Sequence, residues 1–173
     1  MIDYNLEYYE NMLRMYSTTA ERISKIRWEF IKDLNVKTVL DYGSGVGWFR
    51  AWRPREIEVH SFDIGPYPQT EAKYLDYDLL TLWDVLEHLP SMVHLEYWFD
   101  RIKYIALTTP VLPNNAELKD WKHFKPGEHL NYYDRKSLDS LFREYKFKRI
   151  KDGYPECPPR VDIWSVVYKK NRV

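Results

Sequence analysis

Hydrophobic and polar positions alternate along this chain in segments that predict a sheet with helices between its strands. Short apolar runs predict strands, because β-branched and aliphatic side chains suit a sheet that is covered on both faces. These runs occupy residues 36–40, 57–63, 78–83, 103–109, 147–151 and 162–168. Segments with apolar residues three and four positions apart lie between several of the runs and predict amphipathic helices. The combination is typical of an α/β fold.

The first 34 residues predict two helices. In residues 3–16 the apolar positions lie at helical spacing, namely at Tyr9, Met12, Leu13 and Tyr16. Thr18 and Glu21 have the spacing of a capping box, so a second helix is expected to begin there and to run to Leu34. The first helix either docks on the edge of the domain or forms a lid whose tyrosines close over a bound ligand.

Two more helices are expected further along the chain. Ser91 is placed to cap a helix with Met92, Leu95, Phe99 and Ile102 on one face, and Asp134 begins another with Leu138, Leu141, Phe142 and Tyr145. A polar loop over residues 111–133 lies between these two segments. Loops of this length without regular structure are usually functional or disordered.

The most informative stretch is D-Y-G-S-G-V-G at residues 41–47, directly after the first predicted strand. Glycine lacks Cβ, so it takes positive φ and lets a ligand approach the main chain. The helix expected to begin near Val46 would point its free N–H groups and the positive end of its dipole at this turn. The stretch therefore predicts a nucleotide-binding turn.

An acidic residue follows the second predicted strand. Asp63 lies 20 residues after Gly43, about the separation found in Rossmann-type sites. A carboxylate at that position can accept hydrogen bonds from both ribose hydroxyls. The alternative is that Asp63 caps the turn before Gly65 and Pro66.

The segment after Asp63 is too short for a complete crossover. Pro66 and Pro68 break any helix there, and residues 72–75 give at best a stub of strand. A full crossover with its helix needs about a dozen residues. The sheet is therefore expected to be shortened around its third strand.

Three segments resemble the class I S-adenosylmethionine (SAM) dependent methyltransferases. D-x-G-x-G-x-G at residues 41–47 is similar to their first motif. An apolar strand running into D-V-L-E-H-L at residues 84–89 resembles the ubiquinone-biosynthesis-type O-methyltransferase branch, and so does P-G-E-H-L-x-Y-Y at residues 126–133. The resemblance spans residues 36–168. It implies one domain over residues 1–173, with a Rossmann-like doubly wound sheet that is mostly parallel and has an antiparallel final strand.

The resemblance also implies a cofactor site, an acid for the adenine and two candidate bases. The residues expected to bind SAM are Asp41, Gly43, Ser44, Gly45, Gly47, Asp63, Ile64, Trp83 and Asp84. Asp76 stands where an acid often meets the adenine amino group, although the shortened segment puts this in doubt. His88 and His129 are the candidates for a general base, since histidine titrates near neutral pH.

A metal site is a further hypothesis that the resemblance raises. In part of the ubiquinone-type branch, an acidic-x-x-Glu-His set holds a divalent cation. The matching residues here are Asp84, Glu87 and His88, which share a helix face at spacings of three and four. The alternative is that Asp84 caps the helix and His88 is a packing residue, and our prediction assigns no metal.

The implied activity is transfer of a methyl group from SAM to a small-molecule acceptor, with a hydroxyl oxygen as the expected nucleophile. A SAM-fold protein that binds without catalysis is one alternative. A nicotinamide-dependent oxidoreductase is another, disfavoured because Trp48 stands where the dinucleotide fingerprint G-x-G-x-x-G requires glycine.

Composition limits the partners and the compartment. Lys plus Arg and Asp plus Glu both number 26, so no net charge attracts nucleic acid. The single cysteine, Cys157, excludes an internal disulfide and fits a reducing cytoplasm. No apolar run reaches the length of a membrane span, and the N-terminus is too polar for a signal peptide. We expect a cytoplasmic protein.

Overall fold

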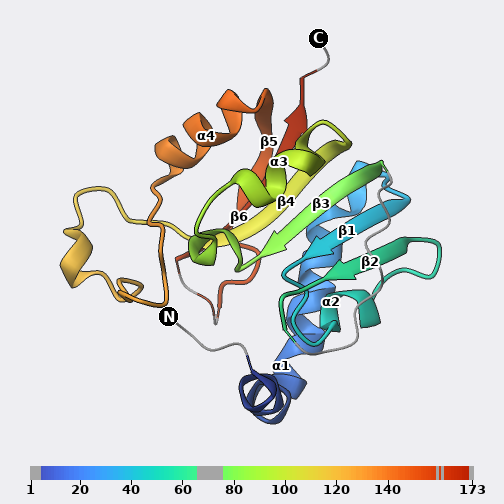
Figure 1. Cartoon of the computed structure of the whole chain (residues 1–173), viewed down its shortest axis with the longest axis horizontal. Helices are drawn as coiled ribbons and strands as arrows, with labels where there is room; N and C mark the ends of the chain where they lie inside the picture. Colours follow the sequence, from blue (N-terminus) through green and yellow to red (C-terminus); the bar gives the residue numbers. More distant parts are fainter. Residues whose placement is uncertain (1–4, 66–75, 159, 161, 172–173) are drawn as a thin grey trace.

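The computed structural model describes residues 5–65, 76–158, 160 and 162–171. In chain order the elements are α1 (Leu6–Ile31), η1 (Lys32–Leu34), β1 (Thr38–Tyr42), α2 (Trp48–Ala51), β2 (Glu58–Phe62), β3 (Tyr77–Trp83), η2 (Leu86–His88), α3 (Val93–Phe99), β4 (Ile102–Pro110), η3 (Leu118–Asp120), α4 (Arg135–Glu144), β5 (Phe147–Gly153) and β6 (Ile163–Lys170). This α/β arrangement confirms the predicted fold class (Figure 1).

The described strands form one six-stranded sheet in the order β2-β1-β3-β4-β6-β5. Strands β1 to β4 pair in parallel, whereas β6 runs antiparallel to both β4 and β5. The strand order reverses after β1, because β2 lies on one side of it and β3 on the other. Ligands bind at such a switch point, outside the carboxyl ends of the strands. The mostly parallel sheet with an antiparallel last strand was predicted and is confirmed.

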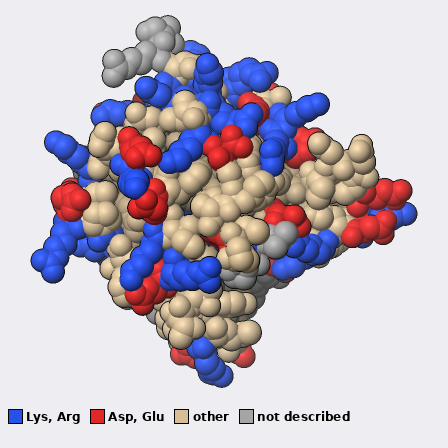
Figure 2. Space-filling view, turned by 180° about the vertical axis from the view of Figure 1, so that it is seen from behind, with Lys and Arg blue, Asp and Glu red and all other residues tan. Residues whose placement is uncertain are grey.

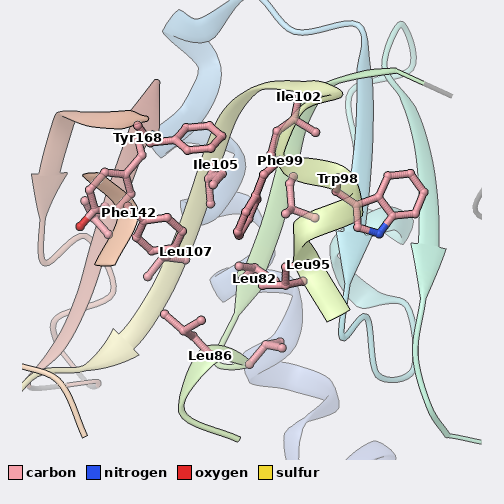
Figure 3. Packing of buried hydrophobic residues seen from close by; sticks show 14 of the residues in the cluster. Leu82, Leu86, Leu95, Trp98, Phe99, Ile102, Ile105, Leu107, Phe142 and Tyr168 are labelled. Atoms are coloured by element: carbon pink, nitrogen blue, oxygen red, sulfur yellow. The ribbon is translucent and has the colours of Figure 1, made fainter. Parts of the chain in front are cut away.

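Successive strand residues point to opposite faces of the sheet and build two apolar cores. On one face, Leu40, Leu80 and Leu107 pack with residues of α3 and α4 such as Leu95 and Phe142 (Figure 3). The other face packs against α1 and α2 through Val39, Leu79, Ala106, Val167, Trp28, Ile31 and Phe49. Both faces of the sheet are therefore covered, which explains why the central strands are continuous apolar runs.

The N-terminal region differs from the prediction, because α1 is one helix of 26 residues rather than two. Asn5 caps it, with its side chain accepting a hydrogen bond from the Tyr8 N–H at 3.0 Å. No Gly or Pro interrupts residues 6–31, so the chain has no reason to leave the helix before Thr18. Thr18 and Glu21 have the spacing of a capping box but lie inside the helix. The helix is followed by η1, which ends at Leu34.

Two other helices are shorter than predicted. The helix after the glycine turn begins at Trp48, not near Val46, because Gly47 still has the left-handed φ of 84°. It ends at Ala51, ahead of Pro54, as expected. Helix α3 ends at Phe99, and Ile102 begins β4 instead of continuing the helix. Helix α4 confirms the prediction, because Asp134 caps it in a capping box with Ser137.

The shortened region lies between β2 and β3. Residues 66–75, which include the expected stub of a third strand at 72–75, are outside the described residues. Among the described strands, β2 stands at the edge of the sheet.

None of the helices in the described part of the chain combines the length and the apolar composition needed to cross a membrane.

Candidate functional site

The glycine turn between β1 and α2 is a half-buried stretch of main chain. Gly43, Gly45 and Gly47 all have positive φ, at 77°, 56° and 84°. A Cβ on Gly43 would lie 2.3 Å from a methyl group of Val85, so this glycine permits close packing. Among the residues that the structure describes, a Cβ on Gly45 or Gly47 would meet no atom within 4 Å. The main chain at Gly45 and Gly47 therefore has space beside it that a ligand could occupy.

Asp63 lies directly against this bare backbone, as its spacing predicted. Its Oδ2 accepts a hydrogen bond from the Gly45 N–H at 2.7 Å. The turn is fixed to the end of β2 by two more bonds, in which the N–H groups of Gly43 and Ser44 donate to the carbonyl of Phe62. Ile64, the next predicted cofactor residue, is 74% exposed beside Asp63.

Helix α1 covers the other oxygen of the Asp63 carboxylate. Oδ1 accepts hydrogen bonds from the Tyr9 hydroxyl at 2.5 Å and from the Gly65 N–H at 2.8 Å. Tyr9 itself is buried although it lies in the first turns of α1. Asp63 also caps the turn at Gly65, which was the alternative considered for it from the sequence, and its role toward a ribose stays a prediction.

Asp41 stands at the end of β1 with one oxygen unsatisfied. Its Oδ1 accepts a hydrogen bond from Thr81 at 2.8 Å, whereas Oδ2 is buried without a partner. Burial is the main reason why the pKa of this carboxyl rises to about 7. A buried acceptor without a donor is costly, and a bound donor or an ordered water would satisfy it.

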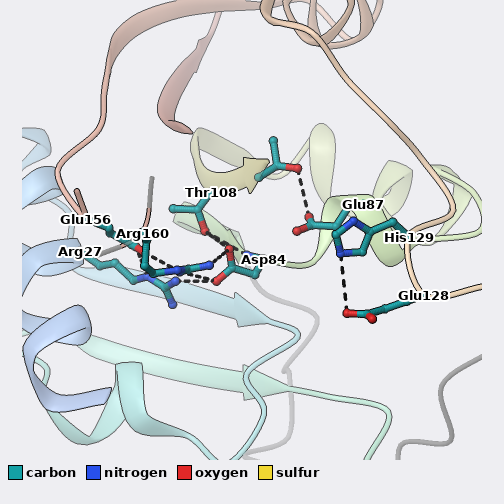
Figure 4. A network of polar contacts seen from close by, with 9 residues as sticks. Arg27, Asp84, Glu87, Thr108, Glu128, His129, Glu156 and Arg160 are labelled. Atoms are coloured by element: carbon teal, nitrogen blue, oxygen red, sulfur yellow. Dashed lines mark hydrogen bonds and ion pairs between the residues drawn. The ribbon is translucent and has the colours of Figure 1, made fainter. Parts of the chain in front are cut away.

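Asp84 is held by two arginines at the carboxyl end of β3. Arg160 forms a bidentate pair with it, at 2.8 Å to each oxygen, and Arg27 donates to Oδ2 at 2.7 Å (Figure 4). Glu156, fully buried, accepts from both arginines. Burial alone would raise the pKa of Asp84, but the charges of Arg160 and Arg27 outweigh it and hold the pKa well below its usual range.

Trp83, the last residue of β3, is packed inside this network. The Arg27 guanidinium lies over its ring at 5.0 Å from the centroid, and Phe49 contacts it at 5.4 Å between ring centroids. The indole N–H is buried and has no hydrogen-bond partner among the described residues. Of the predicted cofactor residues, Trp83 and Asp84 thus lie at the expected strand end but are engaged by α1.

The long loop 111–133 docks on η2 and brings His129 to the candidate base His88. The Glu87 carbonyl accepts hydrogen bonds from the N–H groups of Leu130 at 2.7 Å and Asn131 at 3.1 Å. The Asn131 side chain donates to the carbonyl of Leu89 at 2.6 Å. The rings of His88 and His129 lie 4.9 Å apart between centroids, in an edge-to-face arrangement.

Glu87 lies close to both histidines, and Figure 4 shows it beside His129. One ligand atom from each of Glu87, His88 and His129 lies within 4.8 Å of the others. Burial raises the pKa of Glu87 to about 8, and the nearby charge of Asp84 adds to this. Burial, followed by the proximity of His88, lowers the pKa of His129. We call these three residues the Glu–His–His cluster.

The Mg²⁺ set implied by the resemblance does not form. Asp84 was to join Glu87 and His88, but both of its oxygens are bonded to arginine. A cation at Asp84 would be repelled by two guanidinium groups and would have to displace their hydrogen bonds. The third donor in the structure is His129, which is 41 residues from His88 in the sequence and did not enter that set.

Tyr8 is a half-buried tyrosine near the start of α1. Burial raises the pKa of its phenol, and the next causes are the negative charges of Glu128 and Asp63. Glu128 precedes His129, and its carbonyl accepts a hydrogen bond from His88 at 2.9 Å.

Sequence reasoning missed the residues that hold Asp84. Arg160 and Glu156 lie in an irregular segment and carried no signal. Arg27 did carry one, because it lies four residues after Ile23 and four before Ile31, both of which are buried. A charged residue on the apolar stripe of a helix indicates a buried ionic partner.

The fold and the sequence place the chain in a known family. A family model described as "Methyltransferase domain" matches residues 12–151. No curated protein matches the sequence. The chain belongs to this methyltransferase family, which confirms the predicted enzyme class. The match does not single out the ubiquinone-type branch.

Solved structures of SAM-dependent methyltransferases share the fold. The magnesium protoporphyrin IX methyltransferase of Synechocystis PCC 6803, with bound S-adenosylhomocysteine, is 14% identical, with a TM-score of 0.69 over 97% of this chain and 96% of that one. A SAM-dependent methyltransferase from Archaeoglobus fulgidus is 17% identical, with a TM-score of 0.66 over 94% and 100%. A 1,6-didemethyltoxoflavin N1-methyltransferase from Burkholderia thailandensis, with bound 1,6-didemethyltoxoflavin and S-adenosylhomocysteine, is 13% identical, with a TM-score of 0.63 over 95% and 88%.

Proposed function

We propose that this protein transfers a methyl group from SAM to a hydroxyl oxygen of a small molecule. The observation that carries the proposal is the free space at Gly45 and Gly47, directly beside the Asp63 carboxylate. A ligand with a ribose fits this arrangement, because the carboxylate accepts both ribose hydroxyls while the flat backbone admits the rest of the nucleoside. Methyltransferases of the same fold carry S-adenosylhomocysteine in crystals.

The two ends of SAM would then contact different residues. Ile64 and Asp63 would lie beside the adenosine, and Asp76 stays a prediction for the adenine amino group. The unsatisfied Oδ2 of Asp41 would accept a hydrogen bond, direct or through water, from the ammonium group of the methionine end. Bound SAM supplies an electrophilic methyl group on a sulfonium.

The Glu–His–His cluster supports a hydroxyl acceptor. An alcohol must lose its proton as its oxygen attacks the methyl group, and a neutral histidine is the usual acceptor of that proton. Burial favours the neutral form of His129 at pH 7, since it lowers the pKa of the imidazole. The remaining requirement is alignment of the two reactants, which alone can remove about 7–11 kcal/mol from the barrier.

A small acceptor also fits the distribution of charge. Basic and acidic side chains both occur across the face shown in Figure 2, and the whole chain has no net charge. A polyanion such as RNA is bound mainly through many phosphate contacts, which need an excess of Lys and Arg. The acceptor expected here is therefore small rather than a nucleic acid.

Calorimetric titration with SAM, S-adenosylhomocysteine and NAD tests the cofactor. We expect the two adenosyl compounds to bind and NAD not to bind. Asp63→Ala should weaken SAM binding about 100-fold, since two charge-assisted hydrogen bonds are lost, whereas Asp120→Ala, at an exposed acid in η3, should not. Binding of NAD instead of SAM would disprove the proposal.

Methyl transfer itself is tested with labelled SAM and fractionated cell extract. We expect label to appear in a small-molecule fraction and in a form stable to the mild alkali that cleaves methyl esters, as an ether is. Label only in protein or nucleic acid would contradict a small acceptor. Tight SAM binding with no transfer to any fraction would favour the non-catalytic alternative.

A further inference from the structure

The Glu–His–His cluster is built from two segments that the fold fixes against each other. Glu87 and His88 belong to η2, directly after β3, and His129 belongs to the loop that docks on it. The positions of the three side chains are therefore fixed by two docked segments and not by a single loop. Val85, two residues before Glu87, packs on Gly43 of the glycine turn, so the cluster begins close to the proposed cofactor site.

Each of the two histidines of the cluster forms a hydrogen bond between one ring nitrogen and a backbone carbonyl. His88 Nδ1 bonds to the carbonyl of Glu128, and His129 Nδ1 bonds to the carbonyl of His123, both at 2.9 Å. A carbonyl only accepts, so Nδ1 carries the hydrogen and Nε2 keeps its lone pair. Metal-binding histidines show this arrangement, in which the outer hydrogen bond fixes the tautomer and the ring orientation.

Glu87 is a buried acid without a cationic partner. It is 3% exposed, and it forms no ion pair with any Lys or Arg in the described part of the chain. Its Oε2 accepts a hydrogen bond from Thr109 at 3.1 Å, which leaves Oε1 as a second acceptor. The arginines nearby are bound to Asp84 and Glu156. A buried carboxylate needs either a proton or a positive charge.

We propose that Glu87, His88 and His129 bind a divalent transition-metal ion through one carboxylate oxygen and two Nε2 atoms. Two imidazoles and one carboxylate favour Zn²⁺ or Fe²⁺, whereas Mg²⁺ prefers oxygen ligands and water. One ligand atom from each of the three residues lies within 4.8 Å of the others. Ligands of Zn²⁺ lie about 2.0–2.2 Å from the ion, so each donor would move inwards by less than about 1 Å.

The ion would act on the acceptor, and this part of the inference rests on the proposed function. Three protein ligands leave a coordination position open for the acceptor hydroxyl. Coordination would lower the pKa of that hydroxyl, so that its proton could pass to solvent and its oxygen could attack the methyl group, with S-adenosylhomocysteine as the leaving group. In the metal-bound form the histidines would be ligands, and solvent would take the proton that His129 takes in the form without metal.

Metal binding is tested on the whole chain without SAM. Protein stripped with EDTA is titrated with Zn²⁺ by calorimetry and with Co²⁺ followed by visible absorption, because Co²⁺ reports its ligand geometry. We expect one site per chain. His129→Ala and Glu87→Gln should each weaken metal binding at least about 100-fold. Loss of a residue that only orients a metal ligand already costs about 10- to 100-fold, and these two residues are proposed as ligands themselves. Glutamine keeps the shape of Glu87 and its acceptor oxygen for Thr109.

A matched control uses the exposed histidine in α3. His94→Ala should leave the affinity and the Co²⁺ spectrum unchanged, since His94 lies outside the cluster. The inference is wrong if His129→Ala and Glu87→Gln bind Co²⁺ like the unmodified protein, or if Mg²⁺ binds as tightly as Zn²⁺. SAM titration of the stripped protein is a separate measurement, so loss of SAM binding would overturn the proposed function without touching the metal site.

Discussion

The hydroxyl of Tyr9 donates a hydrogen bond to the carboxylate of Asp63, although 54 residues separate them in the sequence. The same carboxylate accepts the N–H of Gly45, so the first turns of α1 reach the glycine turn. A Cβ on Gly65 would lie 2.3 Å from the Tyr9 ring, which shows how closely the ring is seated. This contact places Tyr9 at the carboxylate predicted to bind the ribose, and the lid interpretation of the N-terminal residues stays a prediction.

Replacing Tyr9 with Phe should strengthen SAM binding. Ribose hydroxyls that bond to Asp63 must displace the Tyr9 hydroxyl, and a hydrogen bond to a charged group contributes about 1.5–3 kcal/mol. We expect an affinity about 10-fold higher in Tyr9→Phe, measured by calorimetry. Tyr16→Phe, at a tyrosine that is 50% exposed on the same helix, serves as the control. Weaker binding in Tyr9→Phe would mean that the hydroxyl contacts the cofactor instead of competing with it.

Gly45→Ala should reduce SAM affinity more than stability. The added methyl group enters space that is free of protein atoms, so the fold tolerates it apart from the strain of a φ of 56°, about 1 kcal/mol. In that space it would clash with the nucleoside and lower the affinity about 30-fold, as an overpacking cost of about 2 kcal/mol predicts. Gly153→Ala in β5, also without neighbours at the Cβ position, is the matched control. Equal affinities of the two variants would exclude the turn from the cofactor site.

Asp84→Asn should destabilise the protein strongly. The substitution removes the carboxylate charge, so among the described residues Arg27 and Arg160 keep only Glu156 as an ion-pair partner. Removing one partner of a partly buried ion pair costs about 2–3 kcal/mol of unfolding free energy. The free energy of unfolding, measured with urea, gives this value directly. Glu21→Gln removes the exposed ion pair between Glu21 and Lys25 in α1 and should cost less than about 1 kcal/mol. Comparable losses would show that the Asp84 network is not a buried unit.

Asp41→Asn should change how stability depends on pH. The pKa of Asp41 is raised by burial from 3.8 to about 7, so between these values the native state keeps a proton that the unfolded chain releases. Stability therefore falls as pH rises through this range, and the fall ends above pH 7. We expect the difference in unfolding free energy between the Asn variant and the wild type to grow in favour of Asn by up to about 3 kcal/mol from pH 5 to 8. Parallel pH profiles would refute the raised pKa.

Local patterns were enough to predict the sheet and the glycine turn after its first strand. The strand after residue 36 and the run at 78–83 are apolar because both of their faces are covered, and that signal does not depend on distant residues. Asp63 was found because a fixed spacing after the glycines reflects the geometry of two neighbouring parallel strands. The cap at Asp134 was found because it satisfies backbone groups within four residues.

Contacts between distant segments could not be predicted in the same way. The partners of Asp84 come from α1 and from the segment after β5, and no local pattern links residues 27, 84 and 160. His129 was recognised as a candidate, but its meeting with Glu87 depends on how a loop of irregular structure docks on η2. The single helix α1 was missed because the pattern of Thr18 and Glu21 occurs inside helices as well as at their ends.

Helix α1 makes three contacts with distant residues and is not interrupted between them. Tyr9 bonds to Asp63, Arg27 bonds to Asp84, and Trp28 stacks on Phe49 at 4.2 Å between ring centroids. The helix contains no Gly or Pro that could serve as a hinge. It can therefore release Tyr9 only if its first turns unfold or if the whole helix tilts about its buried C-terminal half. A tilt would pull on Arg27, so binding of the methyl donor at one end of α1 would shift the end of β3, which precedes the Glu–His–His cluster.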